Sequence, residues 1–151
     1  MTPREVFLRL AHGVADRQFD VLPELYAEHT DVRHPMSPYG DHPLLTRDAL
    51  RKHFGAAGPQ VAEVVKFRPE NIVVHETQDP EVIVAEFEYR GTVLATGAPF
   101  AVPAIFVLRV RDGLIVESRD YIDHVAFARA RGEMEQLIKV LRGPAPAPAV
   151  S

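Results

Sequence analysis

A chain of 151 residues, 46% hydrophobic and 25% charged, can form one domain with its own core and leaves little room for a second. Without cysteine it cannot form disulfides, cysteine-based metal sites or a thiolate nucleophile. The net charge of -4, with acidic and basic residues interspersed, argues against nucleic-acid binding. No segment approaches the roughly 20 apolar residues of a membrane span, and the N-terminus lacks a secretory signal pattern. We therefore expect a cytoplasmic protein with no nucleic-acid or membrane partner.

The first part of the chain is predicted to be mostly helical. Apolar residues recur with helical spacing over 3–17, and a second, short helix can begin after Asp20. Thr46 is a good N-cap for a third helix, which we expect to end near Gly58 and Pro59. Between the second and third helices, residues 30–36 alternate as a short strand.

The part that follows, to about residue 123, is strand-like. Runs rich in β-branched and aromatic residues are separated by turn glycines, and they lie at 61–74 (interrupted by Pro69), 82–89, 100–110 and 114–122. A last helix is expected over 125–141, with a possible interruption at Gly132. Residues 1–142 would form the domain, and the Pro/Ala-rich residues 143–151 a disordered tail.

Three helices followed by an antiparallel meander predict an α+β domain with its helices on one face of a bent sheet. The other sheet face would then be available to a second copy of the chain, so we expect a homodimer through the outer sheet face.

Strand alternation places an acid in apolar surroundings. In 82–89 the face that carries Phe87 and Tyr89 is apolar and should point toward the helices, because burying the glutamates of the other face would be costly. In 114–122 the corresponding face holds residues 114, 116 and 122, together with Ser118 and Asp120. Desolvation there would raise the pKa of Asp120 toward the range useful for proton transfer at neutral pH.

His34 shares a face of the first strand with Val32 and Met36, so it also projects from an apolar row. An imidazole and a carboxylate in one apolar pocket could act as a general acid/base pair. Simpler interpretations remain open: Asp120 could pair with Arg119 or Arg129, or cap the last helix, and His34 could be a hydrogen-bonded core residue. The other histidines are scattered, without the spacing of a zinc site, so we expect no metal.

Two segments resemble the nuclear transport factor 2-like superfamily. Residues 112–123, before the last helix, are similar to its C-terminal signature: Asp-Gly-Leu-Ile-Val-Glu-Ser-Arg-Asp-Tyr-Ile-Asp. Residues 25–35 are similar to the stretch after its second helix. The nearest branches are the SnoaL-like polyketide cyclases and the limonene-epoxide hydrolases, and the likeness extends over residues 3–131. It implies a cone-shaped, curved antiparallel β-sheet wrapped around N-terminal helices (an α+β barrel), with a deep pocket and commonly a dimer.

The resemblance also narrows the set of reactions that this chain could catalyse. The epoxide hydrolases activate water with an Asp-Arg-Asp group helped by a tyrosine and an asparagine. Asp120 matches the first aspartate, but Phe87 and Tyr89 stand where the arginine and second aspartate would be. Val32 and His34 stand at the tyrosine and asparagine positions. The water-activating set is therefore mostly missing.

Ketosteroid isomerases, a related branch, differ in a similar way. By this resemblance, His34 stands at the position of their catalytic base. Leu10 and Phe106 stand at the two positions of their oxyanion donors. Without those donors, stabilisation of a dienolate would lose its main electrostatic contribution. The polyketide-cyclase branch, in which a pocket carboxylate promotes an intramolecular aldol closure, fits best.

We therefore expect a cofactor-independent cyclase, isomerase or hydratase that acts on a hydrophobic carbonyl or polyketide-like compound. Asp120 and His34 would handle protons, and the ligand would contact Leu10, Val32, Phe54, Phe87, Tyr89, Phe106 and Ser118. The alternatives are a non-catalytic binding protein for an apolar small molecule, an epoxide hydrolase with an altered water-activating set, and a protein-interaction scaffold that uses the outer sheet face.

Overall fold

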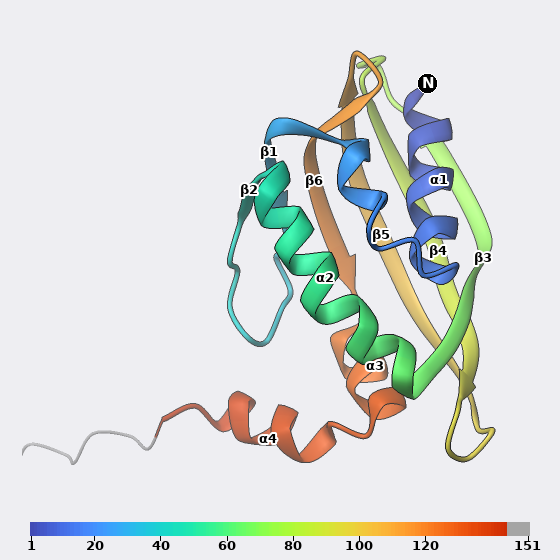
Figure 1. Cartoon of the computed structure of the whole chain (residues 1–151), viewed down its shortest axis with the longest axis vertical. Coiled ribbons are helices and arrows are strands. Elements are labelled where there is room, and N and C mark those ends of the chain that lie inside the picture. Colours follow the sequence, from blue (N-terminus) through green and yellow to red (C-terminus); the bar gives the residue numbers. More distant parts are fainter. Residues whose placement is uncertain (145–151) are drawn as a thin grey trace, which may run out of the picture.

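The computed structural model describes residues 1–144, in which helices cover one face of a curved sheet (Figure 1). The final residues of the predicted tail, 145–151, lie outside the described part. The elements in chain order are α1 (Pro3–Ala15), a 3-10 helix η1 (Leu22–Leu25), β1 (Tyr26–Arg33), β2 (Leu44–Thr46), α2 (Arg47–Val64), β3 (Val65–Glu76), β4 (Val82–Val93), β5 (Pro99–Arg111), β6 (Leu114–Ile122), α3 (His124–Arg131) and α4 (Met134–Arg142).

The six strands form one sheet in the order β2-β1-β6-β5-β4-β3. Strands β3 to β6 make the expected antiparallel meander. The expectation of a wholly antiparallel sheet was wrong in one pair, because β1 lies parallel to β6. The meander leaves β6 with a free edge, and β1 fills it from far away in the sequence. This pairing sets the first strand beside the last one.

Two proline-based boundaries were wrong. Helix α2 continues through Pro59 to Val64 instead of ending there. Packing explains why the helix continues, because this part of α2 is held against Phe19. Gly58 is buried there, so close to Phe19 that a side-chain carbon at position 58 would lie 2.6 Å from its ring. Strand β3 likewise continues through Pro69, which is tolerated because β3 is an edge strand of the sheet.

Other helix and strand ends differ from the predicted ones by a few residues. Strand β1 begins at Tyr26 and ends before His34, and Met36 lies in the following loop, 67% exposed, instead of sharing the apolar face. The predicted last helix is divided at Gly132, whose φ of 72° suits glycine and ends α3 before α4 begins.

The core lies between α1 and the concave face of the sheet. Phe7 of α1 packs edge-on against Phe87 and Phe106, with ring centroids 5.1 and 6.2 Å apart. The predicted inward face of β4 is confirmed, since Ile83, Ala85, Phe87 and Tyr89 are all buried. Burial of such aromatic side chains is the main source of stability in a domain of this size.

The alternation of β6 is confirmed only for its second half. Ser118 and Asp120 point inward, but Ile115 is buried in place of Leu114 and Val116. The register between β5 and β6 shifts between Arg109 and Val110, as in a β-bulge, and this shift reverses the alternation. Ser118 and Asp120 lie after the shift, in the part of β6 where the predicted alternation is correct.

The convex face of the sheet carries an ion-paired cluster in which Arg109 contacts Asp79 at 2.8 Å and Glu81 at 3.0 Å. Ile105 on the same strand as Arg109 is 41% exposed. The homodimer through this face stays a prediction. None of the helices in residues 1–144 is both long enough and apolar enough to cross a membrane.

Candidate active site

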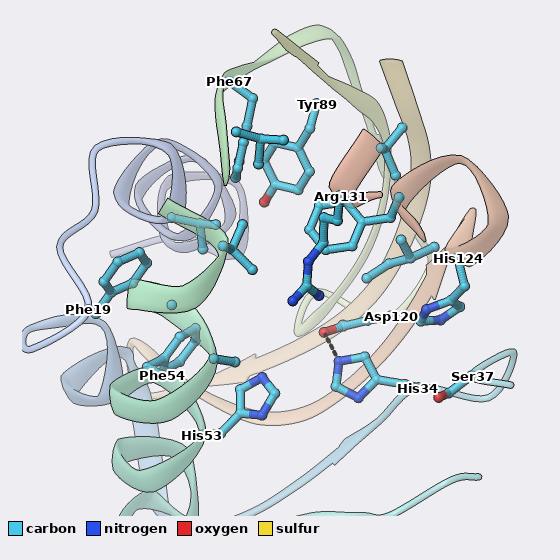
Figure 2. A pocket seen from close by; sticks show the side chains of 18 of the residues that line it. Phe19, His34, Ser37, His53, Phe54, Phe67, Tyr89, Asp120, His124 and Arg131 are labelled. Atoms are coloured by element: carbon cyan, nitrogen blue, oxygen red, sulfur yellow. Dashed lines mark ion pairs between the residues drawn. The ribbon is translucent and has the colours of Figure 1, made fainter. Parts of the chain in front are cut away.

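A cavity of about 510 Å³ lies between the helices and the concave face of the sheet, and most of its wall is apolar. This volume suits a drug-sized organic molecule. Figure 2 shows the side chains that surround it. Five of the residues predicted to contact a ligand line the cavity, namely Leu10, Val32, Phe54, Tyr89 and Phe106.

The other two predicted contact residues do not line the cavity. Phe87 lies one layer deeper, with its ring centroid 5.1 Å from those of Phe7, Tyr89 and Phe106. Aromatic packing therefore occupies the side chain of Phe87. Ser118 is buried and donates a hydrogen bond to Oδ1 of Asp120, so it acts on that carboxyl group instead of on a ligand.

Asp120 projects from β6 into the cavity wall and is only 6% exposed. Phe106 faces it across the strand pair, so its neighbour on β5 is apolar. Burial raises the pKa of Asp120 to about 7, and the hydrogen bond from Ser118 partly opposes that rise. The carboxyl group therefore exists in both protonation states near neutral pH, as general acid/base catalysis requires.

His34 follows β1 and reaches the same part of the cavity. Its Nε2 lies 3.6 Å from Oδ2 of Asp120, as the dashed line in Figure 2 marks. Desolvation lowers the pKa of His34, and the nearby charge of Asp41 partly opposes that effect. This distance is too long for a direct hydrogen bond between the imidazole and the carboxyl group. Neither group is therefore occupied by the other, and both can bond to a bound molecule.

The simpler interpretations of Asp120 do not fit the geometry. Within residues 1–144 the only basic side chain within 4 Å of its carboxyl group is His34, whose lowered pKa keeps it neutral, whereas Arg119 and Arg129 are exposed. The cap of α3 is Asp123, whose Oδ1 accepts a hydrogen bond from the backbone N–H of Ala126 at 2.9 Å. Strand β1 and strand β6 run side by side, and this parallel pairing brings Asp120 and His34 together.

The unusual pKa of Asp120 should make stability depend on pH. An unfolded carboxyl group ionises near pH 4, whereas Asp120 in the folded protein ionises near 7. The folded state therefore holds the proton more tightly, so stability from this group is present at low pH and is lost as pH rises through about 7. The free energy of unfolding should fall by up to about 4 kcal/mol between pH 4 and 8 because of this group, at roughly 1.4 kcal/mol per pKa unit.

This contribution can be isolated with Asp120→Asn, which cannot ionise. Urea unfolding of both proteins across that pH range should show the variant gaining stability relative to the wild type as pH rises. A difference between the two proteins that does not change with pH would contradict the raised pKa.

Sequence analysis missed several polar residues of the cavity wall: Tyr26, His53, His124 and Arg131. Burial and the nearby Asp120 raise the pKa of both Tyr26 and Tyr89, so their hydroxyl groups stay protonated and can donate hydrogen bonds. The ring of His53 lies 6.0 Å from that of His34. His124 and Arg131 were detectable in principle, since a separation of seven residues places both on one face of a helix.

No group of three or more metal-ligating side chains occurs in the part of the chain that the structure covers. The groups of the cavity wall that can act on a bound molecule include Asp120, His34 and the two tyrosines. These are one carboxyl group poised between its protonation states, one neutral imidazole and hydroxyl donors around an apolar cavity.

Known proteins resemble this chain in sequence and fold. An uncharacterized PhzA/B-like protein of Pseudomonas aeruginosa is 30% identical over 117 residues, which cover 75% of this chain and 83% of that protein. The structure called "Putative Isomerase from Bacillus subtilis" superposes with a TM-score of 0.74 at 22% identity, over 86% of this chain and 92% of the other. A "putative polyketide cyclase" from Pseudomonas putida gives 0.65 at 17% identity, over 87% and 98% of the two chains.

At such low identity the solved structures show the shared fold, a curved α+β cone, and do not identify the reaction. The family model of the SnoaL-like domain matches residues 7–118, which contain most of the sheet and two of the helices that cover it. The chain therefore belongs to the SnoaL-like domain family, in the nuclear transport factor 2-like superfamily.

Proposed function

We propose that this protein is a cofactor-independent enzyme of the cyclase or isomerase type, acting on a hydrophobic carbonyl or polyketide-like compound. The observation that carries the proposal is the buried carboxyl group of Asp120, exposed only to the cavity and with its pKa raised to about 7. A purely structural aspartate gains little from such a position, because the desolvation of its carboxylate outweighs the hydrogen bond from Ser118 and destabilises the fold.

The reaction begins with proton removal. The Asp120 carboxylate takes a proton from the carbon next to a substrate carbonyl, and the electron pair of that C–H bond forms an enolate. In a cyclisation the enolate carbon attacks a second carbonyl of the same molecule, and the resulting alkoxide takes the proton back from the carboxyl group of Asp120, which restores the carboxylate. In an isomerisation the proton returns to a different carbon. Neither route needs an oxidant or a reductant.

The cavity supplies the positioning that such a reaction requires. Holding the two reacting carbons in contact turns the ring closure into an intramolecular event with a high effective concentration. His34, whose lowered pKa keeps it neutral, can transfer a proton to or from an oxygen. The hydroxyl group of Tyr89, which also lines the cavity, can hydrogen-bond a substrate oxygen.

The proposal can be tested without the natural substrate. Ketones such as 2-tetralone and 2-acetylnaphthalene are small and apolar enough for the cavity, and binding can be measured by calorimetry. Those that bind should exchange hydrogen for deuterium at the α-carbon in heavy water faster than in buffer, as followed by proton NMR. Ketones that bind but exchange only at the buffer rate would contradict catalysis and favour the binding-protein alternative.

The remaining alternatives have less support. The scaffold interpretation does not explain a largely apolar cavity of about 510 Å³. Hydrolysis of an epoxide would need a water held by several polar groups beside Asp120. Of the positions that would supply them, Val32 is apolar and Phe87 lies outside the cavity wall.

A further inference from the structure

Two buried side-chain nitrogens lack a hydrogen-bond partner in residues 1–144, and both belong to α3. They are Nε2 of His124, at the start of the helix, and Nε of Arg131, at its end. Both residues line the cavity, as do Phe127 and Ala128 between them. One face of α3 therefore lies in the cavity wall, and its two unpaired nitrogens are buried within that wall.

Arg131 is held in place by its neighbours. Its guanidinium carbon lies 5.3 Å from the centre of the Phe127 ring, and its Nη2 forms an ion pair with Oε1 of Glu133 at 3.0 Å. Figure 2 shows the guanidinium group pointing into the cavity, toward the side that holds Asp120 and His34. Because this group is permanently charged and points into the cavity, its position suits an acceptor that arrives with a ligand.

The charges on the cavity wall favour an anionic acceptor. Arg17, Lys66 and Arg131 supply three positive charges, and Arg17 and Lys66 form no ion pair within the described chain. Only Glu133 and Asp120 can oppose them, and Asp120 is partly protonated near neutral pH. The wall is therefore net positive, although the whole chain carries a net charge of -4.

We propose that Arg131 binds a carboxylate group of the substrate, so that the substrate is an apolar acid that carries both a carboxylate and a carbonyl. A permanent carboxylate fits better than the enolate formed during reaction, because it matches the permanent charge of Arg131, whereas the enolate is charged only during the reaction. The guanidinium group would thus hold the carboxylate on the α3 side of the cavity, while Asp120 acts on the carbonyl-bearing part of the same substrate. This inference names the substrate class of the proposed enzyme.

The test compares two unreactive probes of nearly the same shape, 2-naphthoate and the neutral 2-naphthamide, by calorimetry near neutral pH. The wild type should bind the naphthoate about 10- to 100-fold more tightly, as expected for a charge-assisted hydrogen bond. Arg131→Met should remove this preference and leave the affinity for the naphthamide nearly unchanged. Arg129→Met is the matched control, because Arg129 lies on the same helix but is exposed and outside the cavity.

Glu133→Gln adds a change in the opposite direction. Its carboxylate competes for the guanidinium group, so its removal should strengthen binding of the naphthoate and not of the naphthamide. Equal affinity of the wild type for both probes, equal weakening of both by Arg131→Met, or no gain from Glu133→Gln would overturn the proposal. Because neither probe reacts, failure here is distinct from failure of the ketone exchange experiment, which tests the proposed reaction.

Discussion

Asp120→Asn should lower the rate of α-proton exchange in a bound ketone by about 10²- to 10⁴-fold, the usual contribution of a positioned general base. Asparagine has the same shape but cannot accept the proton. Ketone affinity should change little, because the wall around Asp120 is mainly apolar. The measurement is the exchange rate at saturating ketone together with the dissociation constant, so that loss of catalysis is separated from loss of binding.

Two other residues of β6 provide the comparison. Glu117→Gln removes a carboxylate from the same strand, but its side chain is 54% exposed and contacts Arg109 on the convex face, so the exchange rate should not change. Ser118→Ala removes the hydrogen bond that favours the ionised form of Asp120. It should move the midpoint of the pH profile upward while the plateau rate stays similar.

The wild-type profile should itself rise as pH increases through about 7, since only the carboxylate form of Asp120 accepts a proton. A profile with its midpoint near the ordinary carboxyl value, or a rate in Asp120→Asn close to that of the wild type, would assign the base to another group.

Alternation along strands was enough to predict how the main site residue is placed. In β4, glutamates on one face and aromatic residues on the other leave a single way to face the helices, and the structure agrees. The same argument placed Asp120 correctly in β6 but failed for Leu114 and Val116, because a register shift is not visible in local alternation. The alternation along a strand therefore predicts which way a side chain points only within a stretch that has no register shift.

Features that depend on distant residues could not be predicted. The parallel pairing of β1 with β6, which brings His34 within 3.6 Å of Asp120, joins segments about ninety residues apart in sequence. Pro59 inside α2 also reflects tertiary packing, because the burial of Gly58 against Phe19 overrides the local stop signal. The spacing of Arg131 and His124 indicates a shared helix face, but the orientation of that face into the cavity follows from where α3 packs.

Gly91→Ala should cause the largest loss of stability among the substitutions considered. A side-chain carbon at Gly91 would lie 1.8 Å from the carbonyl oxygen of Lys66 and 2.6 Å from Cα of Phe67. Both atoms belong to the backbone of β3, the strand paired with β4 at this point, so a rotamer change cannot relieve the overlap. We expect the free energy of unfolding to fall by about 3–5 kcal/mol, as measured by urea denaturation.

The consequence should extend to the cavity, because Lys66 and Phe67 form part of its wall and the ring of Phe67 packs 4.8 Å from that of Tyr89. Gly55→Ala is the contrasting variant, since it lies inside α2 with no atom within 4 Å of the added carbon. It should raise stability by roughly 0.5–1 kcal/mol, the usual gain of alanine over glycine in a helix. If Gly91→Ala were as stable as Gly55→Ala, strands β3 and β4 could separate locally without cost, and the close approach that shapes this wall would not be a constraint.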